Sequence, residues 1–238
     1  MPASRVSCLM TTRDRPEFIA QALRCFSRQT YADRELILVD AGEQTLVEDF
    51  CSGIDGVRYV RAEPGANYGA CLNLAAREAD GEVLQLLDDD DYYNPRFLER
   101  AVSTVEGAGI ENTIAAWDCF HVLLRDEKRV RFSGHGWGAG ATLCFGRTVW
   151  ERTPFHDTGA SQDWFFKEES GATIVPVCAP ELYLLVRHGG NSWRNLRGTD
   201  VDAYFRALPV SGLEVADIVE PADLQFYFAL TRRDDDDE

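Results

Sequence analysis

Short apolar runs alternate with helical patterns over the first half of the chain. The apolar runs are short and bounded by turn residues, which is typical of buried strands; they are Val6–Met10, Leu36–Val39, Val57–Val60 and Val83–Leu87. Between them, apolar residues recur at the spacing of an amphipathic helix; the two sets are Phe18, Ile19, Ala22, Leu23 and Phe26, and Leu72, Leu74, Ala75 and Ala79. This alternation predicts a mostly parallel sheet with helices on both faces.

Local signals mark where these helices begin and end. Asp14 and Glu17 have the spacing of a capping box, and Pro16 falls in the expected first turn. Gly81 is expected to end the second helix.

The second half of the chain carries a different pattern. Trp117–Leu124 and Val130–Phe132 predict a hairpin, and a glycine-rich loop, Ser133–Gly140, follows it. Further strands are expected at Ala141–Phe145, Thr173–Val177 and Leu182–Val186, and helices near Asp200–Ala207 and Ala222–Thr231.

Charge and composition narrow the functional classes. The net charge of −16 argues against a protein that binds nucleic acid or docks on an anionic membrane surface. Part of this charge lies in the tail Asp234–Glu238, which we expect to be solvated. The seven scattered cysteines predict reduced core thiols, and no apolar stretch is long enough for a signal peptide or a transmembrane segment. We therefore expect a cytoplasmic protein.

Polar residues follow several of the predicted strands. Thr11–Arg13, Asp40 and Asp88–Asp91 all lie at carboxyl ends, where ligands bind in parallel sheets, so one crevice is expected to collect them. Four adjacent carboxylates repel one another unless a cation is present, and their oxygens suit Mg²⁺ or Mn²⁺. A solvated acidic loop is the alternative interpretation.

The order and spacing of these motifs resemble family 2 glycosyltransferases with the GT-A fold. Val6–Phe18 is similar to the family's first strand and its T-x-N-R-P-x-F turn, with Asp14 in place of Asn. Asp88-Asp89-Asp90 is similar to the D-x-D signature. The other matching segments are Gln29–Tyr31, Leu36–Asp40, Asn67–Ala70 with Asn73, Ser161–Phe166 (E-D-W, with Gln162 for Glu) and Leu185–Trp193 (R-x-H-x-x-x-S). After Asp40 the chain departs from the family's D-D-G-S, because Ala41 and Gly42 follow.

The resemblance implies a fold and a division of the chain. It implies an α/β, Rossmann-like GT-A domain over residues 1–195, with a mostly parallel sheet, flanking helices and a small antiparallel sheet on the acceptor side. Residues 1–93 would bind the nucleotide sugar and residues 94–195 the acceptor, while residues 196–238 would form a C-terminal helical extension with an acidic tail.

The resemblance also implies an activity and the residues that carry it. The chain would transfer a sugar from a nucleotide diphosphate donor, expected to be a UDP-sugar, to an acceptor hydroxyl with inversion, assisted by Mn²⁺ or Mg²⁺. Asp163 would be the general base, and Asp90 and His188 would hold the metal. Trp137 and Trp164 would line the acceptor side. The donor-binding residues would be Thr11, Arg13, Asp40, Asn67, Gly69, Asn73, Asp88, Asp89 and Arg187.

Several of these residues have a structural alternative. Asp40 is also suited to a turn, Arg13 to an exposed surface, Asp163 to a helix N-cap, His188 to a structural turn and Trp137 to an ordinary flexible loop. Two other functions compete with transfer: a binding module that has lost turnover, and a haloacid-dehalogenase-like phosphatase. The phosphatase lacks a suitably placed lysine, since Lys128 and Lys167 are the only two. The sequence leaves open the acceptor, the donor sugar, the choice of cation and the oligomeric state.

Overall fold

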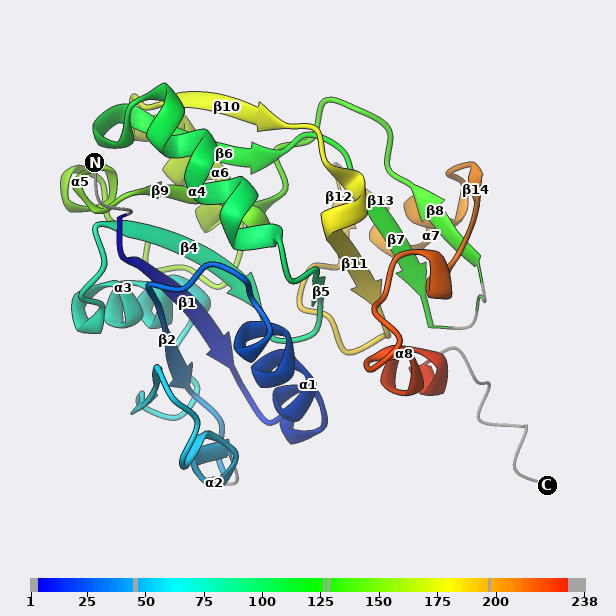
Figure 1. The fold of residues 1–238 in the computed structure, drawn as a ribbon, viewed down its shortest axis with the longest axis horizontal. Coiled ribbons are helices and arrows are strands. Elements are labelled where there is room, and N and C mark those ends of the chain that lie inside the picture. Colours follow the sequence, from blue (N-terminus) through cyan, green and yellow to red (C-terminus); the bar gives the residue numbers. More distant parts are fainter. Residues whose placement is uncertain (1–3, 45–46, 126, 128, 197, 231–238) are drawn as a thin grey trace.

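The computed structural model describes residues 4–44, 47–125, 127, 129–196 and 198–230, and it contains two main sheets that lie side by side (Figure 1). The larger sheet has the strand order β10-β6-β9-β4-β1-β2-β3. Its strands are β1 (Val6–Thr12), β2 (Arg34–Asp40), β3 (Val57–Arg61), β4 (Val83–Asp88), β6 (Thr113–Trp117), β9 (Cys144–Gly146) and β10 (Thr173–Val177). All neighbours are parallel except β9, which is antiparallel to β4 and β6. The predicted mostly parallel sheet is confirmed.

Helices cover both faces of this sheet. The helices beside the large sheet are α1 (Pro16–Ser27), α2 (Val47–Cys51), α3 (Tyr68–Glu78), α4 (Phe97–Ala108), α5 (Arg147–Arg152) and α6 (Gln162–Glu169). Helices α7 (Val201–Arg206) and α8 (Leu224–Leu230) lie beside the smaller sheet (Figure 1). Alternate side chains of β1 point to opposite faces. Cys8 and Met10 join the core cluster under α1 and α4, whereas Leu9 joins the cluster under α3, α5 and α6. Short 3₁₀ turns lie at Ile110–Asn112, Gly140–Thr142, Pro180–Leu182 and Val215–Asp217.

The smaller sheet has the order β14-β8-β7-β11-β5. Its strands are β5 (Tyr92–Tyr93), β7 (His121–Leu124), β8 (Arg129–Phe132), β11 (Tyr183–Arg187) and β14 (Val210–Glu214), and a separate two-stranded ribbon consists of β12 (Asn195–Leu196) and β13 (Thr199–Asp200). Three of its four pairings are antiparallel, and β7 with β11 is parallel. The predicted hairpin is present as β7 and β8, but Trp117 ends β6 in the large sheet and the chain bends before β7.

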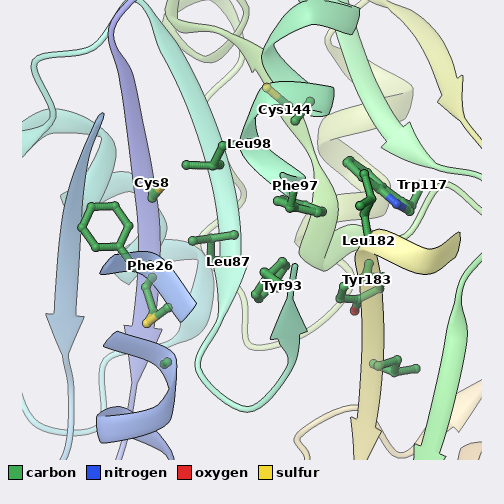
Figure 2. Close-up of a cluster of buried hydrophobic side chains, with 14 of the residues drawn as sticks. Cys8, Phe26, Leu87, Tyr93, Phe97, Leu98, Trp117, Cys144, Leu182 and Tyr183 are labelled. Carbon is green, nitrogen blue, oxygen red and sulfur yellow. The ribbon is translucent and has the colours of Figure 1, made fainter. Parts of the chain in front are cut away.

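Aromatic side chains fill the space between the two sheets. Figure 2 shows Tyr93, Phe97, Trp117 and Tyr183 gathered there. The rings of Phe97 and Trp117 stack with centroids 4.2 Å apart, and the Trp117 indole N–H donates to the carbonyl of Ala179 at 2.8 Å. All four aromatic side chains are buried, so the two sheets share one core.

The C-terminal segment differs from the expected helical extension. It supplies the two expected helices, α7 and α8, but also strand β14, which extends the smaller sheet by pairing with β8. Phe205 of α7 is fully buried in the same core cluster as β1. The expected acidic tail, Asp234–Glu238, lies outside the described residues. Among the described residues, no helix has the length and apolar character needed to cross a membrane.

Candidate functional site

The carboxyl ends of β1, β2 and β4 bring the predicted polar residues together. In the strand register Thr12 lies beside Asp40 and Thr11 beside Asp88. The chain runs outward from β1 to β2 and β3 and then returns to β4 on the other side of β1, so these residues lie at the topological switch point of the sheet. The predicted gathering of strand ends is confirmed.

Asp88 lies at the end of β4, facing α3. The hydroxyl of Tyr68, the first residue of α3, donates to Asp88 Oδ1 at 2.9 Å. Burial raises the pKa of Asp88 to about 6, with repulsion from Asp90 as the next cause; the Tyr68 hydrogen bond and the charge of Arg15 act in the opposite direction. A cation bound nearby would therefore stabilise the ionised form of Asp88.

Asp90 is buried and surrounded by donors. Its Oδ2 accepts from Arg15 at 2.6 Å, from the imidazole Nε2 of His188 at 3.0 Å and from the side-chain amide of Asn191 at 3.2 Å. Burial alone would raise the pKa of Asp90, but the His188 hydrogen bond and the Arg15 charge outweigh it and the pKa is lowered. Asp90 is thus the carboxylate of the cluster that stays ionised most readily.

Arg15 joins two members of the acidic cluster. Besides Asp90, its guanidinium contacts Asp89 Oδ1 at 2.9 Å. Asp89 Oδ2 is buried and has no hydrogen-bond partner among the described residues. Burial, followed by repulsion from Asp90, raises the pKa of Asp89 to about 8. One cationic side chain therefore only partly offsets the charge of this cluster.

The fourth carboxylate, Asp91, is committed to the fold. It accepts the Tyr183 hydroxyl at 2.5 Å and the backbone N–H of Val186 at 2.8 Å, so it fastens the loop after β4 to β11. Burial raises the pKa of Asp91 well above its usual range. A solvated acidic loop, the alternative interpretation of the sequence, is therefore wrong for Asp89, Asp90 and Asp91, all of which are buried.

The cluster fits a hard divalent cation. One carboxylate oxygen from each of Asp88, Asp90 and Asp91 can be chosen so that the three lie within 4.8 Å of one another. Since Asp91 is held by Tyr183 and Val186, Asp88 and Asp90 are the residues that would bind Mg²⁺ or Mn²⁺. The second oxygen of Asp89 is buried without a hydrogen-bond partner among the described residues, and a cation nearby would stabilise the ionised form of this carboxyl group.

His188 lies beside Asp90 as predicted, but in a defined tautomer. The backbone N–H of Gly190 donates to His188 Nδ1 at 3.3 Å, which leaves Nε2 as the protonated nitrogen that donates to Asp90. In this arrangement His188 orients Asp90. Direct binding of a metal through Nε2 would require the other tautomer.

Asp163 is the second residue of α6. The helix N-cap is Ser161, which has φ of 61°, so the N-cap interpretation of Asp163 is wrong.

Asp163 is half-buried, and its carboxylate lies 3.6 Å from Lys167 Nζ. A Cβ added at Gly140 would lie 2.6 Å from Asp163 Oδ2, so glycine is required for the loop to approach this carboxylate. Repulsion from Asp163 is among the causes that raise the pKa of Asp88 and of Tyr68. The charge of Asp163, from the second half of the chain, therefore acts on residues of the first half.

Asp40 is fully buried at the end of β2. Its Oδ1 accepts the backbone N–H of Gly42 at 2.8 Å, and its Oδ2 accepts from Arg61 at 2.7 Å and from the Tyr59 hydroxyl at 3.0 Å. The turn interpretation of Asp40 is thus confirmed. Of the other two residues predicted to bind the nucleoside, Thr11 is half-buried and Arg13 is exposed.

Three residues predicted near the donor make contacts within the protein. Asn73 uses both ends of its amide: Nδ2 donates to the carbonyl of Phe155 at 2.8 Å, and Oδ1 accepts from Phe155 N and Trp150 Nε1. Asn67 caps α3 through Ala70 N. A Cβ at Gly69 would fall 1.8 Å from the carbonyl oxygen of His156, so this glycine is needed for helix packing. The sequence prediction that these residues face the donor did not anticipate the segment after α5 that packs on α3.

Arg187 and Trp137 also differ from the prediction. Arg187 is buried, donates to Asp202 at 2.7 Å and lies over the ring of Trp193. Trp137 stacks on Phe205 with centroids 5.8 Å apart, so it is a packed loop anchor and not a free sugar platform. Trp164 is 53% exposed on α6 beside Asp163, as an acceptor-side residue would be.

Sequence reasoning missed Arg15, Tyr68 and Asn191. All three lie within the identified motifs. Arg15 is near Arg13 in the sequence, Tyr68 follows Asn67, and Asn191 is near His188. The sequence signal for Arg15 was a second basic residue in the turn after the first strand, which the fold was expected to place near the four carboxylates after the fourth strand. The direction of each side chain depends on the local backbone conformation, such as the positive φ of Asp14. The predicted capping box of Asp14 with Glu17 is wrong: the Asp14 carboxylate accepts the backbone N–H of Glu43, and the N-cap of α1 is Arg15.

Sequence comparison relates the chain to known proteins. The model of the family described as Glycosyl transferase family 2 matches residues 7–163. The chain is 29% identical over 105 residues to the uncharacterized glycosyltransferase YwdF of Bacillus subtilis, covering 44% of this chain and 39% of that protein. It is 27% identical over 112 residues to glycosyltransferase AglE of Haloferax volcanii, covering 44% of this chain and 37% of that protein. The chain thus covers well under half the length of either relative.

Solved structures share the fold at low sequence identity. Residues 1–349 of TarS from S. aureus, in complex with UDP-GlcNAc, superpose with a TM-score of 0.63 at 15% identity, over 79% of this chain and 60% of that one. The mannosyltransferase PcManGT from Pyrobaculum calidifontis, in complex with GDP-Man and Mn²⁺, gives a TM-score of 0.63 at 15% identity, over 80% and 59%. With the family model spanning well over half of its residues, the chain belongs to glycosyl transferase family 2 and has the GT-A fold.

Proposed function

We propose that this protein transfers a sugar from a nucleotide diphosphate sugar, expected to be a UDP-sugar, to an acceptor hydroxyl with inversion at the anomeric carbon. The observation that carries the proposal is the buried acidic cluster at the end of β4 and in the bend after it, with Asp163, from the other half of the chain, near enough for its charge to raise the pKa of Asp88. Membership of the family and the nucleotide-sugar complexes of two structural neighbours support it.

The acidic cluster would receive the donor's diphosphate. Mg²⁺ or Mn²⁺ held by Asp88 and Asp90 would offset the negative charge that develops on the leaving group. Arg15 already contacts Asp90 and Asp89 and would lie beside the same phosphates. His188 and Asn191 would keep Asp90 oriented through their hydrogen bonds.

Asp163 would act on the acceptor side. The acceptor oxygen attacks the anomeric carbon, a C–O bond forms, and the bond from that carbon to the diphosphate oxygen breaks. The hydroxyl proton passes to the Asp163 carboxylate, since a neutral hydroxyl is a weak nucleophile. The exposed Trp164 beside it would contact the acceptor.

Substitution of Asp163 by Asn tests this assignment. Asp163→Asn keeps the size of the side chain but cannot accept the proton, so kcat should fall by roughly 10²–10⁴-fold with donor affinity nearly unchanged. Turnover is measured as UDP release with an acceptor, and proton NMR of the product linkage should show the inverted configuration. Glu168→Gln, an exposed carboxylate on the same helix, is the matched control and should retain activity. Retained configuration, or an Asp163→Asn rate within a few-fold of wild type, would contradict the proposal.

One observation favours a second candidate, a nucleotide-sugar-binding module without turnover. Arg15 spans Asp89 and Asp90 and so supplies positive charge to the acidic cluster without a metal. If the module is correct, the protein binds UDP-sugar but releases no UDP, with or without Mn²⁺. Slow release of UDP from a UDP-sugar in Mn²⁺, abolished by EDTA, would instead support the transferase.

A further inference from the structure

Two cysteines lie close together beyond the carboxyl ends of β6 and β10, and β10 is an edge strand of the large sheet. Cys119 follows β6 and Cys178 follows β10, and these neighbouring parallel strands end in register with Trp117 beside Val177. The two Sγ atoms lie 3.6 Å apart. A disulfide has its sulfurs about 2.05 Å apart, whereas two thiolates on one tetrahedral zinc ion, at about 2.3 Å from the metal, lie about 3.8 Å apart. The observed separation is close to the second value.

A histidine completes the group. His135, in the glycine-rich loop, places a ring nitrogen within 4.8 Å of both sulfurs. Its Nδ1 is 2.7 Å from Asp118 Oδ2, and Asp118 Oδ1 also accepts the backbone N–H of Gly136 at 2.8 Å. This carboxylate fixes the ring and leaves Nε2 for a ligand, which is the second-shell arrangement found around metal-binding histidines.

The chemistry of these groups favours a thiophilic cation. Two sulfurs and one imidazole form the N/S donor set of zinc, and hard cations such as Mg²⁺ prefer oxygen ligands. Two thiolates whose sulfurs lie 3.6 Å apart repel each other, and a cation bound between them removes that repulsion. Cys119 is buried while Cys178 and His135 are exposed, which leaves a path by which an ion can enter.

We propose that Cys119, Cys178 and His135 bind one zinc ion that fastens the glycine-rich loop to the ends of β6 and β10. The fourth position would be taken by water, since the site opens to the surface. The loop it holds carries Gly138, whose carbonyl accepts from Lys167 at 2.6 Å, and Gly140, which lies against Asp163. The ion would therefore order the segment that borders the proposed general base.

Cobalt binding tests the site without relying on activity. The purified protein is reduced, freed of metal with EDTA and titrated with Co²⁺, because cobalt bound to thiolates has a ligand-to-metal charge-transfer absorption that carboxylates do not produce. We expect one equivalent of Co²⁺ to give this absorption and Zn²⁺ to displace it. Cys119→Ser and Cys178→Ser should each reduce or abolish it, and Asp118→Asn should weaken binding by about 10–100-fold while leaving all three ligands in place.

Matched controls separate the site from other groups. His156 is an exposed histidine paired with Glu169 at 2.8 Å, so His156→Ala should bind cobalt like wild type while His135→Ala binds it more weakly. Cys51 is a buried cysteine in α2, distant in the sequence from Cys119 and Cys178, so Cys51→Ser should leave the absorption unchanged. Circular dichroism checks that each variant is folded.

Two results would overturn the proposal. One is the absence of thiolate-to-cobalt absorption in the reduced wild-type protein, or its persistence unchanged in Cys178→Ser. The other is a Cys119–Cys178 disulfide found by mass spectrometry in protein that binds no metal after reduction, which would make the pair a redox couple. Neither result bears on glycosyl transfer, which rests on a different group of residues.

Discussion

At the residue scale, the acidic cluster shows how neighbours in sequence acquire different roles. Asp88 faces Tyr68, Asp89 and Asp90 share Arg15, and Asp91 is held by Tyr183 and Val186. The physical cause is that only Asp88 lies in β4, whereas Asp89, Asp90 and Asp91 lie in the bend after it, where each carboxylate meets donors from other segments. A count of carboxylates in the sequence does not distinguish these roles.

The first residue-scale prediction concerns the cation. Asp90→Asn removes a charge from the proposed metal site while keeping much of the hydrogen bonding to His188 and Asn191, so the fold should persist. Mn²⁺-dependent UDP release should fall by at least 100-fold, because the metal offsets the charge of the leaving group, and EDTA should abolish the wild-type rate. Asp33→Asn, an exposed aspartate at the amino end of β2, is the control. Full activity of Asp90→Asn in EDTA would remove the metal from the mechanism.

The second residue-scale prediction concerns pH. The folded-state pKa of Asp89 is raised from 3.8 to about 8 and that of Asp88 to about 6, so the folded state binds more protons than the unfolded state between these values. In EDTA the free energy of unfolding should therefore be highest near the acidic end of this window and decrease as the pH rises from about 4 to about 8. Urea unfolding across the window measures this slope.

Asp89→Asn provides the comparison for that slope. It removes the carboxyl group whose pKa is raised to about 8, the larger of the two shifts. The free energy of unfolding of the variant should therefore decrease less than that of wild type between roughly pH 5 and pH 8. An identical pH slope in the two proteins would show that Asp89 is ionised in the folded state throughout.

At the element scale, close approaches of backbone explain positions that the sequence marked for other reasons. The glycine at the start of α3 was assigned to the donor, yet the backbone of residues 156–158 occupies the space that a side chain at Gly69 would need. Helix α4 was not predicted, although Phe97, Leu98, Ala101, Val102 and Val105 have helical spacing and are all buried. Strand β14 was missed because most of its side chains are exposed and only its pairing with β8 defines it.

Substitution of two helix glycines by alanine should have opposite effects. Gly69→Ala places a Cβ 1.8 Å from the His156 carbonyl oxygen and should destabilise the protein by about 1–3 kcal/mol, the usual cost of overpacking. Gly107 lies within α4, and a Cβ there meets no heavy atom within 4 Å among the described residues. Gly107→Ala should therefore stabilise by up to about 1 kcal/mol. Urea unfolding measures both, and equal effects would contradict the packing argument.

At the scale of the whole molecule, segments on both sides of residue 195 share one core cluster and one sheet. Val201 and Phe205 of α7 belong to the core cluster that also contains β1, and Asp223, just before α8, is buried against Arg28 and Arg24 of the α1 region. The smaller sheet includes strands from both sides of the expected boundary. The protein should therefore unfold as one cooperative unit.

Phe205→Ala tests this cooperativity. Removal of a fully buried ring that stacks on Trp137 should cost about 3–5 kcal/mol, and the transitions seen by circular dichroism and tryptophan fluorescence should still coincide. Phe228→Ala, at a position 42% exposed on α8, should cost much less. Two separate transitions in the wild-type protein would show that the C-terminal segment is an independent unit.

The sequence by itself determined the class of fold and the place of the site. The apolar runs became β1, β2, β3 and β4, and the strand-end rule placed Thr11, Asp40 and Asp88 at one edge, because the periodicity of burial and the geometry of parallel strands are local properties. The family motifs carried Asp90 and His188 to the same site, where they are in contact.

Only the tertiary structure decided which side chains face that site. Arg187 and Asn73 bear the right chemistry, but both donate hydrogen bonds within the protein, to partners 15 and 82 positions away along the chain. Arg15, Tyr68 and the Cys119–His135–Cys178 group were recognisable only after the chain had brought distant segments together. The direction of a side chain depends on strand parity, backbone conformation and long-range packing, and none of these is fixed by a residue and its nearest neighbours.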